Sequence, residues 1–190
     1  MRGPVVCSDG DYAELLGLYL GDGCISRMGR TYALRISFDA RHPQIIRDAS
    51  ELLGRCFPGN SLHRVRVAGS GVRILQLYSN HLPCLLPQHG PGRKHERRIE
   101  LEPWQQAVVD RAPWRFLRGL IRSDGCVFVN RTGPYEYLSY DFTNHSQDIL
   151  DLFTATCDAV GVRYRRNPVR VRICRREAVD LMAEHVGVKA

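Results

Sequence analysis

The chain has 190 residues, of which 44% are hydrophobic and 25% are charged, so it is long enough to bury a core of its own. Its net charge of +7 is typical of proteins that bind a polyanion, most simply nucleic acid, with a membrane surface as the competing partner. No apolar stretch is long enough to cross a membrane, and seven scattered cysteines without a C-x-x-C pair exclude a disulfide framework and a zinc finger.

The first predicted helix carries residues 15–24, with the sequence LLGLYLGDGC, and ends where the next strand opens. A hairpin follows, and its second strand, 31–38, alternates between polar and apolar residues. The remaining elements predicted for this half are a helix over 42–53 with apolar residues at helical spacing, strands over 61–67 and 72–78, and a short helix near 79–86.

The same series of elements starts again at residue 117. Residues 117–126, LRGLIRSDGC, share the frame L-x-G-L-x-x-x-D-G-C with the first copy. The elements predicted after them are a hairpin ending in a strand over 135–142, a helix over 146–160, strands over 162–166 and 169–173, and a helix over 175–185. The repeat predicts an α+β fold of two pseudo-twofold related αββαββα units, each with an antiparallel sheet.

Prolines mark the segment 87–113 as the connection between the two units. We place the N-terminal repeat at residues 1–93, the linker at 94–112 and the C-terminal repeat at 113–190. Two such units would pack across one shared axis.

Several positions of the frame are the same in both copies. Gly17 and Gly119 lie in the middle of their predicted helices, where glycine costs about 1 kcal/mol relative to alanine. A close approach of two helix backbones explains such glycines, because a missing side chain lets the backbones touch. We therefore expect these helices to form the central interface. Cys24 and Cys126, which close the two frames, are expected to be small buried residues.

The strand patterns predict that each sheet has one apolar face and one face rich in arginine. Leu34 and Ile36 alternate with Arg35 and Ser37. Helices would cover the apolar faces and leave the polar faces to lie against DNA phosphates and base edges. The residues expected to contact DNA are Arg27, Arg30, Arg35, Ser37, Arg64, Arg66, Arg73, Gln76, Arg131, Tyr137, Ser139, Asp141, Arg163, Arg165, Arg170 and Arg172.

The two frames resemble the LAGLIDADG motif of homing endonucleases, in the two-motif, single-chain form. The second copy is close to the family form, whereas the first departs from it at Tyr19, Leu20 and Gly21. Members of the family also commonly have a Gly-x-Lys followed by a segment with Ile and Pro before the second motif. This chain has such a segment within residues 92–104. The resemblance covers nearly the whole chain. It implies a monomeric endonuclease of an intron- or intein-linked element that makes a staggered double-strand break in a long, nearly non-palindromic site.

Asp22 and Asp124 end the two motif helices and would project together near the axis. Two adjacent carboxylates repel unless a cation lies with them, and Mg²⁺ prefers carboxylate, water and phosphate oxygens. The pair therefore predicts a centre for Mg²⁺ or another divalent cation such as Mn²⁺, which would lower the pKa of the attacking water. The resemblance assigns catalysis to these two aspartates. We include Gly21 and Ser123, which precede them, among the metal ligands.

Of the 27 basic residues only Lys94 and Lys189 are lysines, and each follows the last helix of its half. Lysine is a compact charge whose pKa can fall when it is crowded, whereas arginine stays protonated. We expect both lysines to take part in catalysis by ordering or activating a water next to a scissile phosphate. A solvated tail is the alternative explanation for Lys189.

An intron RNA maturase and a non-cleaving DNA-binding regulator are the alternative functions for this fold. Retention of both aspartates argues against loss of the nuclease, and 190 residues leave no room for the helix-turn-helix domain that would favour a regulator. We expect double-stranded DNA as the partner, with intron RNA as the alternative and no membrane. The expected location is intracellular, in the cytoplasm of a bacterial or phage host.

Overall fold

The computed structural model describes residues 7–132 and 134–188, and its elements follow the predicted order. The first half consists of α1 (Asp9–Asp22), β1 (Gly23–Met28), β2 (Thr31–Asp39), α2 (Pro43–Cys56), β3 (His63–Arg66), β4 (Val72–Tyr78) and α3 (Leu82–Leu85). A connecting segment holds the 3-10 helix η1 (Lys94–Glu96) and α4 (Pro103–Arg111). The second half consists of α5 (Pro113–Asp124), β5 (Gly125–Thr132), β6 (Tyr135–Thr143), α6 (Gln147–Ala159), β7 (Arg165–Asn167), β8 (Arg170–Ile173) and α7 (Arg176–His185).

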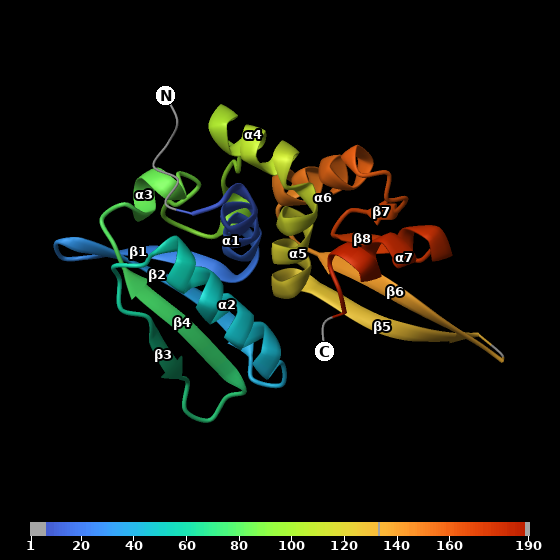
Figure 1. The fold of residues 1–190 in the computed structure, drawn as a ribbon, viewed down its shortest axis with the longest axis horizontal. Helices are drawn as coiled ribbons and strands as arrows, with labels where there is room; N and C mark the ends of the chain where they lie inside the picture. Colours follow the sequence, from blue (N-terminus) through green and yellow to red (C-terminus); the bar gives the residue numbers. More distant parts are fainter. Residues whose placement is uncertain (1–6, 133, 189–190) are drawn as a thin grey trace.

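Each half contributes one four-stranded antiparallel sheet. The strand orders are β1-β2-β4-β3 and β5-β6-β8-β7, so the two sheets share one topology. Figure 1 shows α1 and α5 side by side in the middle, with the first sheet and α2 on one side and the second sheet, α6 and α7 on the other. The predicted α+β architecture of two repeated units is confirmed. Within the described ranges, no helix is both long and apolar enough to cross a membrane.

The alternation of apolar and polar residues along the strands determines which face of each sheet is covered by helices. α2 packs against β4 and α6 packs against β8, so one face of each sheet lies under a helix. The strand residues buried on this helix-covered face are Leu34, Ile36, Leu75 and Leu77 in the first sheet and Tyr140, Phe142, Val171 and Ile173 in the second. Successive side chains point to opposite faces, so the residues between them form an open face on each sheet.

The central helices approach each other at their glycines. A Cβ placed on Gly17 would lie 2.5 Å from the backbone oxygen of Phe116, and one placed on Gly119 would lie 2.3 Å from the backbone oxygen of Glu14. Each of these Cβ positions is 2.9 Å from the Cα of the other glycine. The glycines therefore set the distance between α1 and α5.

A cluster of charged residues joins α1 and α2 to α5 along one side of this helix pair. Glu14 on α1 is only 3% exposed, and its carboxylate oxygens lie 2.9 Å from both Arg115 and Arg122 on α5. Arg55 donates two hydrogen bonds to Asp11 and thereby lowers the pKa of that carboxyl. The other members of the cluster are Asp48 and Arg118. A buried carboxylate is tolerated here because arginines surround it.

The connecting segment contains α4, a helix that was not among the predicted elements. Pro103 occupies the first turn of the helix, where proline is favoured, and the Gln105 side chain accepts a hydrogen bond of 2.9 Å from the backbone N–H of Glu102. Gln105 is fully buried and also donates to the Tyr12 hydroxyl at 2.7 Å. This contact fixes the connecting segment against α1.

Candidate metal centre and nucleic-acid interface

Asp22 and Asp124 are the last residues of α1 and α5, so both carboxylates lie where the paired helices end and the two sheets begin. Gly23 and Gly125 make the abrupt change from helix to strand possible. A Cβ on Gly23 would lie 2.6 Å from the Tyr19 Cα, and one on Gly125 would lie 2.5 Å from the Ile121 backbone oxygen. The Asp-Gly pairs of the sequence frame thus bring two carboxylates to one place from two halves of the chain.

The two helix ends are in direct contact. A Cβ on Gly21 would fall 3.2 Å from Asp124 Oδ2 and would clash with the Ser123 side chain. Ser123 Oγ donates to the backbone oxygens of Gly119 and Leu120 at 3.0 and 2.9 Å. Its hydroxyl is therefore bonded back onto α5. The backbone oxygen of Ser123 is the atom through which it would act as a metal ligand.

Negative charge is concentrated at the ends of α1 and α5, and the positive charge of Lys94 lies next to it. The C-terminal ends of two helices carry partial negative charge, and the aspartates add to it. The Lys94 ammonium donates hydrogen bonds to the backbone oxygens of Tyr19, Leu20 and Gly21, with distances of 2.8 Å to Leu20 and 2.6 Å to Gly21. Lys94 therefore caps α1 at the aspartate pair, and it occupies the backbone oxygen of Gly21, which was predicted to be a metal ligand.

The pKa of Lys94 is shifted by its position. Burial lowers this pKa to about 8, and the negative charges of Asp124 and Asp22 act in the opposite direction. The pKa of Lys94 is thus close to the value that favours proton transfer near neutral pH. Lys189 lies outside the described residues.

The donor set fits a small divalent cation. Across the described ranges, no group of three or more His, Cys, Asp or Glu side chains is placed to hold a metal ion. The two aspartates and the backbone oxygens of Gly21 and Ser123 offer oxygen ligands only, which is the chemistry that Mg²⁺ and Mn²⁺ accept. Magnesium commonly takes one or two carboxylates and completes its shell with water and substrate phosphate.

The open face of the first sheet carries a hydrogen-bonded group around Arg35. Its guanidinium donates to Gln76 Oε1 at 2.9 Å and to Ser26 Oγ at 3.4 Å. Gln76 in turn donates to the Tyr78 hydroxyl. Ser37 shares this face two residues along β2. These side chains present hydrogen-bond donors and acceptors on the open face, which are the groups that direct readout of base edges requires.

The open face of the second sheet is built around Asp141. Arg172 forms a two-pronged pair with it, with both nitrogen–oxygen distances at 2.7 Å, and Arg170 lies 3.7 Å away. The Arg172 guanidinium also lies over the Phe128 ring. Tyr137 and Arg165, two other predicted contact residues, lie on this face. Ser139 lies on it as well but is fully buried and accepts a hydrogen bond of 2.7 Å from Asn130, so the prediction that it contacts DNA was wrong.

The face prediction was wrong for Arg64, Arg66 and Arg73. Arg64 lies opposite Leu75, and Arg73 lies opposite both Phe38 and Arg66, so all three share the side of the helix-covered residues. The residues of β3 on the open face are His63 and Val65. For Arg64 and Arg66 the cause is that β3 is an edge strand whose residues are all exposed, so the alternation along it does not indicate which face is buried. Arg73 lies on β4, directly opposite Arg66.

Four further predicted contacts lie outside the regular open faces. Arg27 and Arg131 lie in line with the helix-covered residues, but near the hairpin tips, which extend beyond the helices (Figure 1). Arg163 precedes β7, because that strand spans Arg165–Asn167 instead of beginning at residue 162. Arg30 lies in the turn between β1 and β2.

The fold is similar to solved structures of low sequence identity. Mesophilic variants of the homing endonuclease I-DmoI match with a TM-score of 0.63 and 18% identity, over 94% of this chain and 89% of that one. The N-terminal LAGLIDADG domain of WhiA matches with a TM-score of 0.59 and 16% identity, over 97% and 86%. The LAGLIDADG meganuclease I-AabMI, bound to uncleaved DNA, matches with a TM-score of 0.55 and 13% identity, over 92% and 82%.

The chain has the LAGLIDADG fold. No family model matches its sequence, and no curated protein sequence matches it either. Matching structures also include I-DmoI in complex with DNA and Mn, and with DNA and Ca. At these identities the likeness shows the fold, so the role of each residue rests on the geometry described above.

In this LAGLIDADG fold the two motif cysteines are exposed, and the expectation that they are buried was wrong. Cys24 pairs with Arg35 across β1 and β2, and Cys126 pairs with Asp141 across β5 and β6. Both therefore lie on the open faces, two residues beyond the aspartates.

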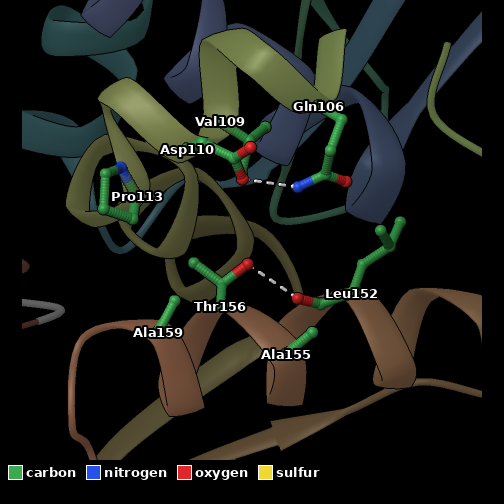
Figure 2. A pocket seen from close by; sticks show the side chains of 8 residues that line it. All are labelled: Gln106, Val109, Asp110, Pro113, Leu152, Ala155, Thr156 and Ala159. Carbon is green, nitrogen blue, oxygen red and sulfur yellow. Dashed lines mark hydrogen bonds between the residues drawn. The ribbon is translucent and has the colours of Figure 1, made fainter. Parts of the chain in front are cut away.

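A pocket of about 260 Å³ lies between α4 and α6, near the opposite end of the central helices (Figure 2). α4 is tied to the start of α1 by the ion pair between Arg111 and Asp9, whereas the aspartate pair lies at the end of α1. The polar groups in the pocket are bonded to their neighbours: Gln106 donates to Asp110 at 2.7 Å. The pocket therefore adds nothing to the metal centre.

Proposed function

We propose that this chain is a site-specific DNA endonuclease of the homing type. It would bind a long, nearly non-palindromic duplex and make a staggered double-strand break by metal-dependent phosphodiester hydrolysis. The observation that carries the proposal is the convergence of Asp22 and Asp124 at the ends of two touching helices, between two polar sheet faces. Because one chain supplies both aspartates and both sheets, a monomer is sufficient.

Each part of the site has a physical task in this reaction. The open faces hold the duplex through phosphate and base-edge contacts and so place the two scissile bonds at the helix ends. Asp22, Asp124 and the adjacent backbone oxygens would hold the divalent cation, and Mg²⁺ or Mn²⁺ bound there would supply a lower pKa for the attacking water and a charge that offsets that of the phosphoryl oxygens. Lys94 fixes the end of α1 and keeps a proton donor beside the centre.

The proposal is tested by selecting duplexes and then cutting them. Duplexes bound by the purified protein are selected from a random library without divalent cation, and the enriched sequence is then incubated with Mg²⁺ or Mn²⁺. We expect one enriched site, cut on both strands only when the cation is present. Binding without cleavage would instead assign the chain the non-cleaving DNA-binding role. The absence of any enriched duplex would contradict site-specific DNA recognition.

Cysteine labelling tests which surface faces DNA. Cys24, Cys126 and Cys84 are all exposed, but Cys84 is on α3, outside both open faces. The alkylation rates of Cys24 and Cys126 are measured by mass spectrometry. With saturating duplex, both rates should fall to the residual rate that the small fraction of protein without DNA produces. Cys84 should react at its original rate. Equal protection of all three cysteines, or protection of Cys84 alone, would place the DNA elsewhere.

A further inference from the structure

The two halves differ at one position beside the aspartates. Asn144 follows β6, and its backbone N–H donates to the Val169 oxygen at 3.0 Å. Ala40 follows β2, and its backbone N–H donates to the Gly71 oxygen at 2.7 Å. These hydrogen bonds link equivalent points of the two sheets, so Asn144 and Ala40 occupy the same place in the repeat.

The side chain of Asn144 bridges Asp124 and the start of α6. Its Nδ2 donates to Asp124 Oδ2 at 2.7 Å, and its Oδ1 accepts from the backbone N–H of Ser146 at 2.8 Å. Ser146 is the N-cap of α6. Only this orientation of the amide works, because exchanging its oxygen and nitrogen would set an acceptor against the carboxylate and a donor against the N–H. Asn144 is therefore fixed at both ends.

This geometry fixes the direction in which Asp124 presents its oxygens. The amide holds one carboxylate oxygen of Asp124 and thereby sets the direction in which this carboxylate would face a bound cation. Partners that orient a metal-binding carboxylate in this way commonly change metal affinity by about 10- to 100-fold when removed. Alanine at position 40 has no side-chain donor, so whatever contacts order Asp22 are of another kind.

We propose that Asn144 is a positioning residue for Asp124, and that its absence from the other half makes the two parts of the centre unequal. The strand cut with the help of Asp124 is then cut faster than the other strand. This inference rests on the proposed nuclease function. It goes beyond that function in naming which half is pre-organised and which residue causes the difference.

The variants separate the contact with Asp124 from the local turn. Asn144→Ser retains a hydroxyl that can accept from the Ser146 N–H, as serine does in such turns, but it is too short to reach Asp124. Asn144→Ala removes both contacts. Ser146→Ala is the matched control, because it removes the cap to the Ile149 N–H, and Asp124 keeps its partner. Ala40→Asn places the equivalent donor in the other half.

The first measurement is the affinity for Mn²⁺, which electron paramagnetic resonance monitors in a titration of the protein bound to the cleaved duplex. The cleaved duplex is used because no cleavage then occurs during the titration. Asn144→Ser and Asn144→Ala should both weaken Mn²⁺ binding by about 10- to 100-fold. Ser146→Ala should bind Mn²⁺ as the original chain does. Unchanged affinity in both Asn144 variants, or the same loss in Ser146→Ala, would overturn the proposal.

The second measurement is the cutting rate of each strand, with a different label on each. Both Asn144 variants should slow one strand more than the other, and Ala40→Asn should speed up the strand that the original chain cuts more slowly. Equal slowing of both strands would overturn the inference. Should the original chain cut neither strand, the nuclease proposal fails by itself, and the Mn²⁺ titration on the uncut duplex still tests the positioning of Asp124.

Discussion

Replacing Asp22 or Asp124 with asparagine should abolish cation-dependent cleavage and preserve DNA binding. Asparagine keeps the size of the side chain and removes the negative charge that a divalent cation requires. A bound metal contributes several kcal/mol of transition-state stabilisation, so each variant should lose roughly 10³-fold or more in rate, since about 1.4 kcal/mol corresponds to tenfold. Single-turnover cleavage of the selected duplex measures this loss.

Binding distinguishes this result from a folding defect. The dissociation constant measured without divalent cation should stay the same or decrease, because a negative charge near two phosphates has been removed. Asp110→Asn makes the same change in charge on α4, away from the aspartate pair, and should cut normally. Cleavage by both single variants at the original rate would remove the aspartates from the mechanism.

Replacing Gly17 or Gly119 with alanine should destabilise the fold and lower activity together. The new Cβ would lie under 3 Å from backbone atoms of the other helix, 2.5 Å from the Phe116 oxygen in one case and 2.3 Å from the Glu14 oxygen in the other. Backbone cannot rotate away, so α1 and α5 must separate. The strain of such overpacking is about 1–3 kcal/mol, and here all the close atoms are backbone, which favours the upper end.

Alanine also gains about 1 kcal/mol of helix propensity, so the net destabilisation is about 2 kcal/mol. For a chain of this size that corresponds to a fall of about 4–8 °C in Tm. Gly54 supplies the matched control, since it lies in α2 with no atom within 4 Å of its Cβ position. Gly54→Ala should raise the Tm, whereas a Tm at or above the original in Gly17→Ala and Gly119→Ala would contradict the close packing.

The repeat made most of the fold predictable, because each half independently showed the same series of helix and strand patterns. The predictions from these sequence patterns were incomplete or wrong at α4 and at β3. α4 was not predicted because the prolines marked residues 87–113 as a connection, although the place of Pro103 after Glu102 and before Gln105 is a signal for a helix start. The faces of β3 could not be read because both sides of that edge strand are exposed.

Those residues of the candidate site could be predicted that the repeat or an unusual residue type identifies. Both aspartates stand at the same place in the two frames, and Lys94 stood out as a rare lysine. The sequence contains no sign that Lys94 bonds to the backbone oxygens of Tyr19, Leu20 and Gly21, because that contact joins distant segments. Asn144 was not among the predicted site residues. The signal that distinguishes it is its alignment with Ala40, which requires the register of both sheets.

The charged cluster around Glu14 also limits how the two halves can be combined. Its acids come from the first half, on α1 and α2, and three of its arginines come from α5 in the second half. If two copies of the second half paired through α5, Phe116 would take the place of Glu14, because Gly119 meets the Glu14 backbone oxygen as Gly17 meets that of Phe116, and the arginines of α5 would lose this carboxylate. If two copies of the first half paired, the buried Glu14 would lose its arginines. The charges therefore favour the unlike pair, and neither half can simply replace the other to make a symmetric pair of like halves.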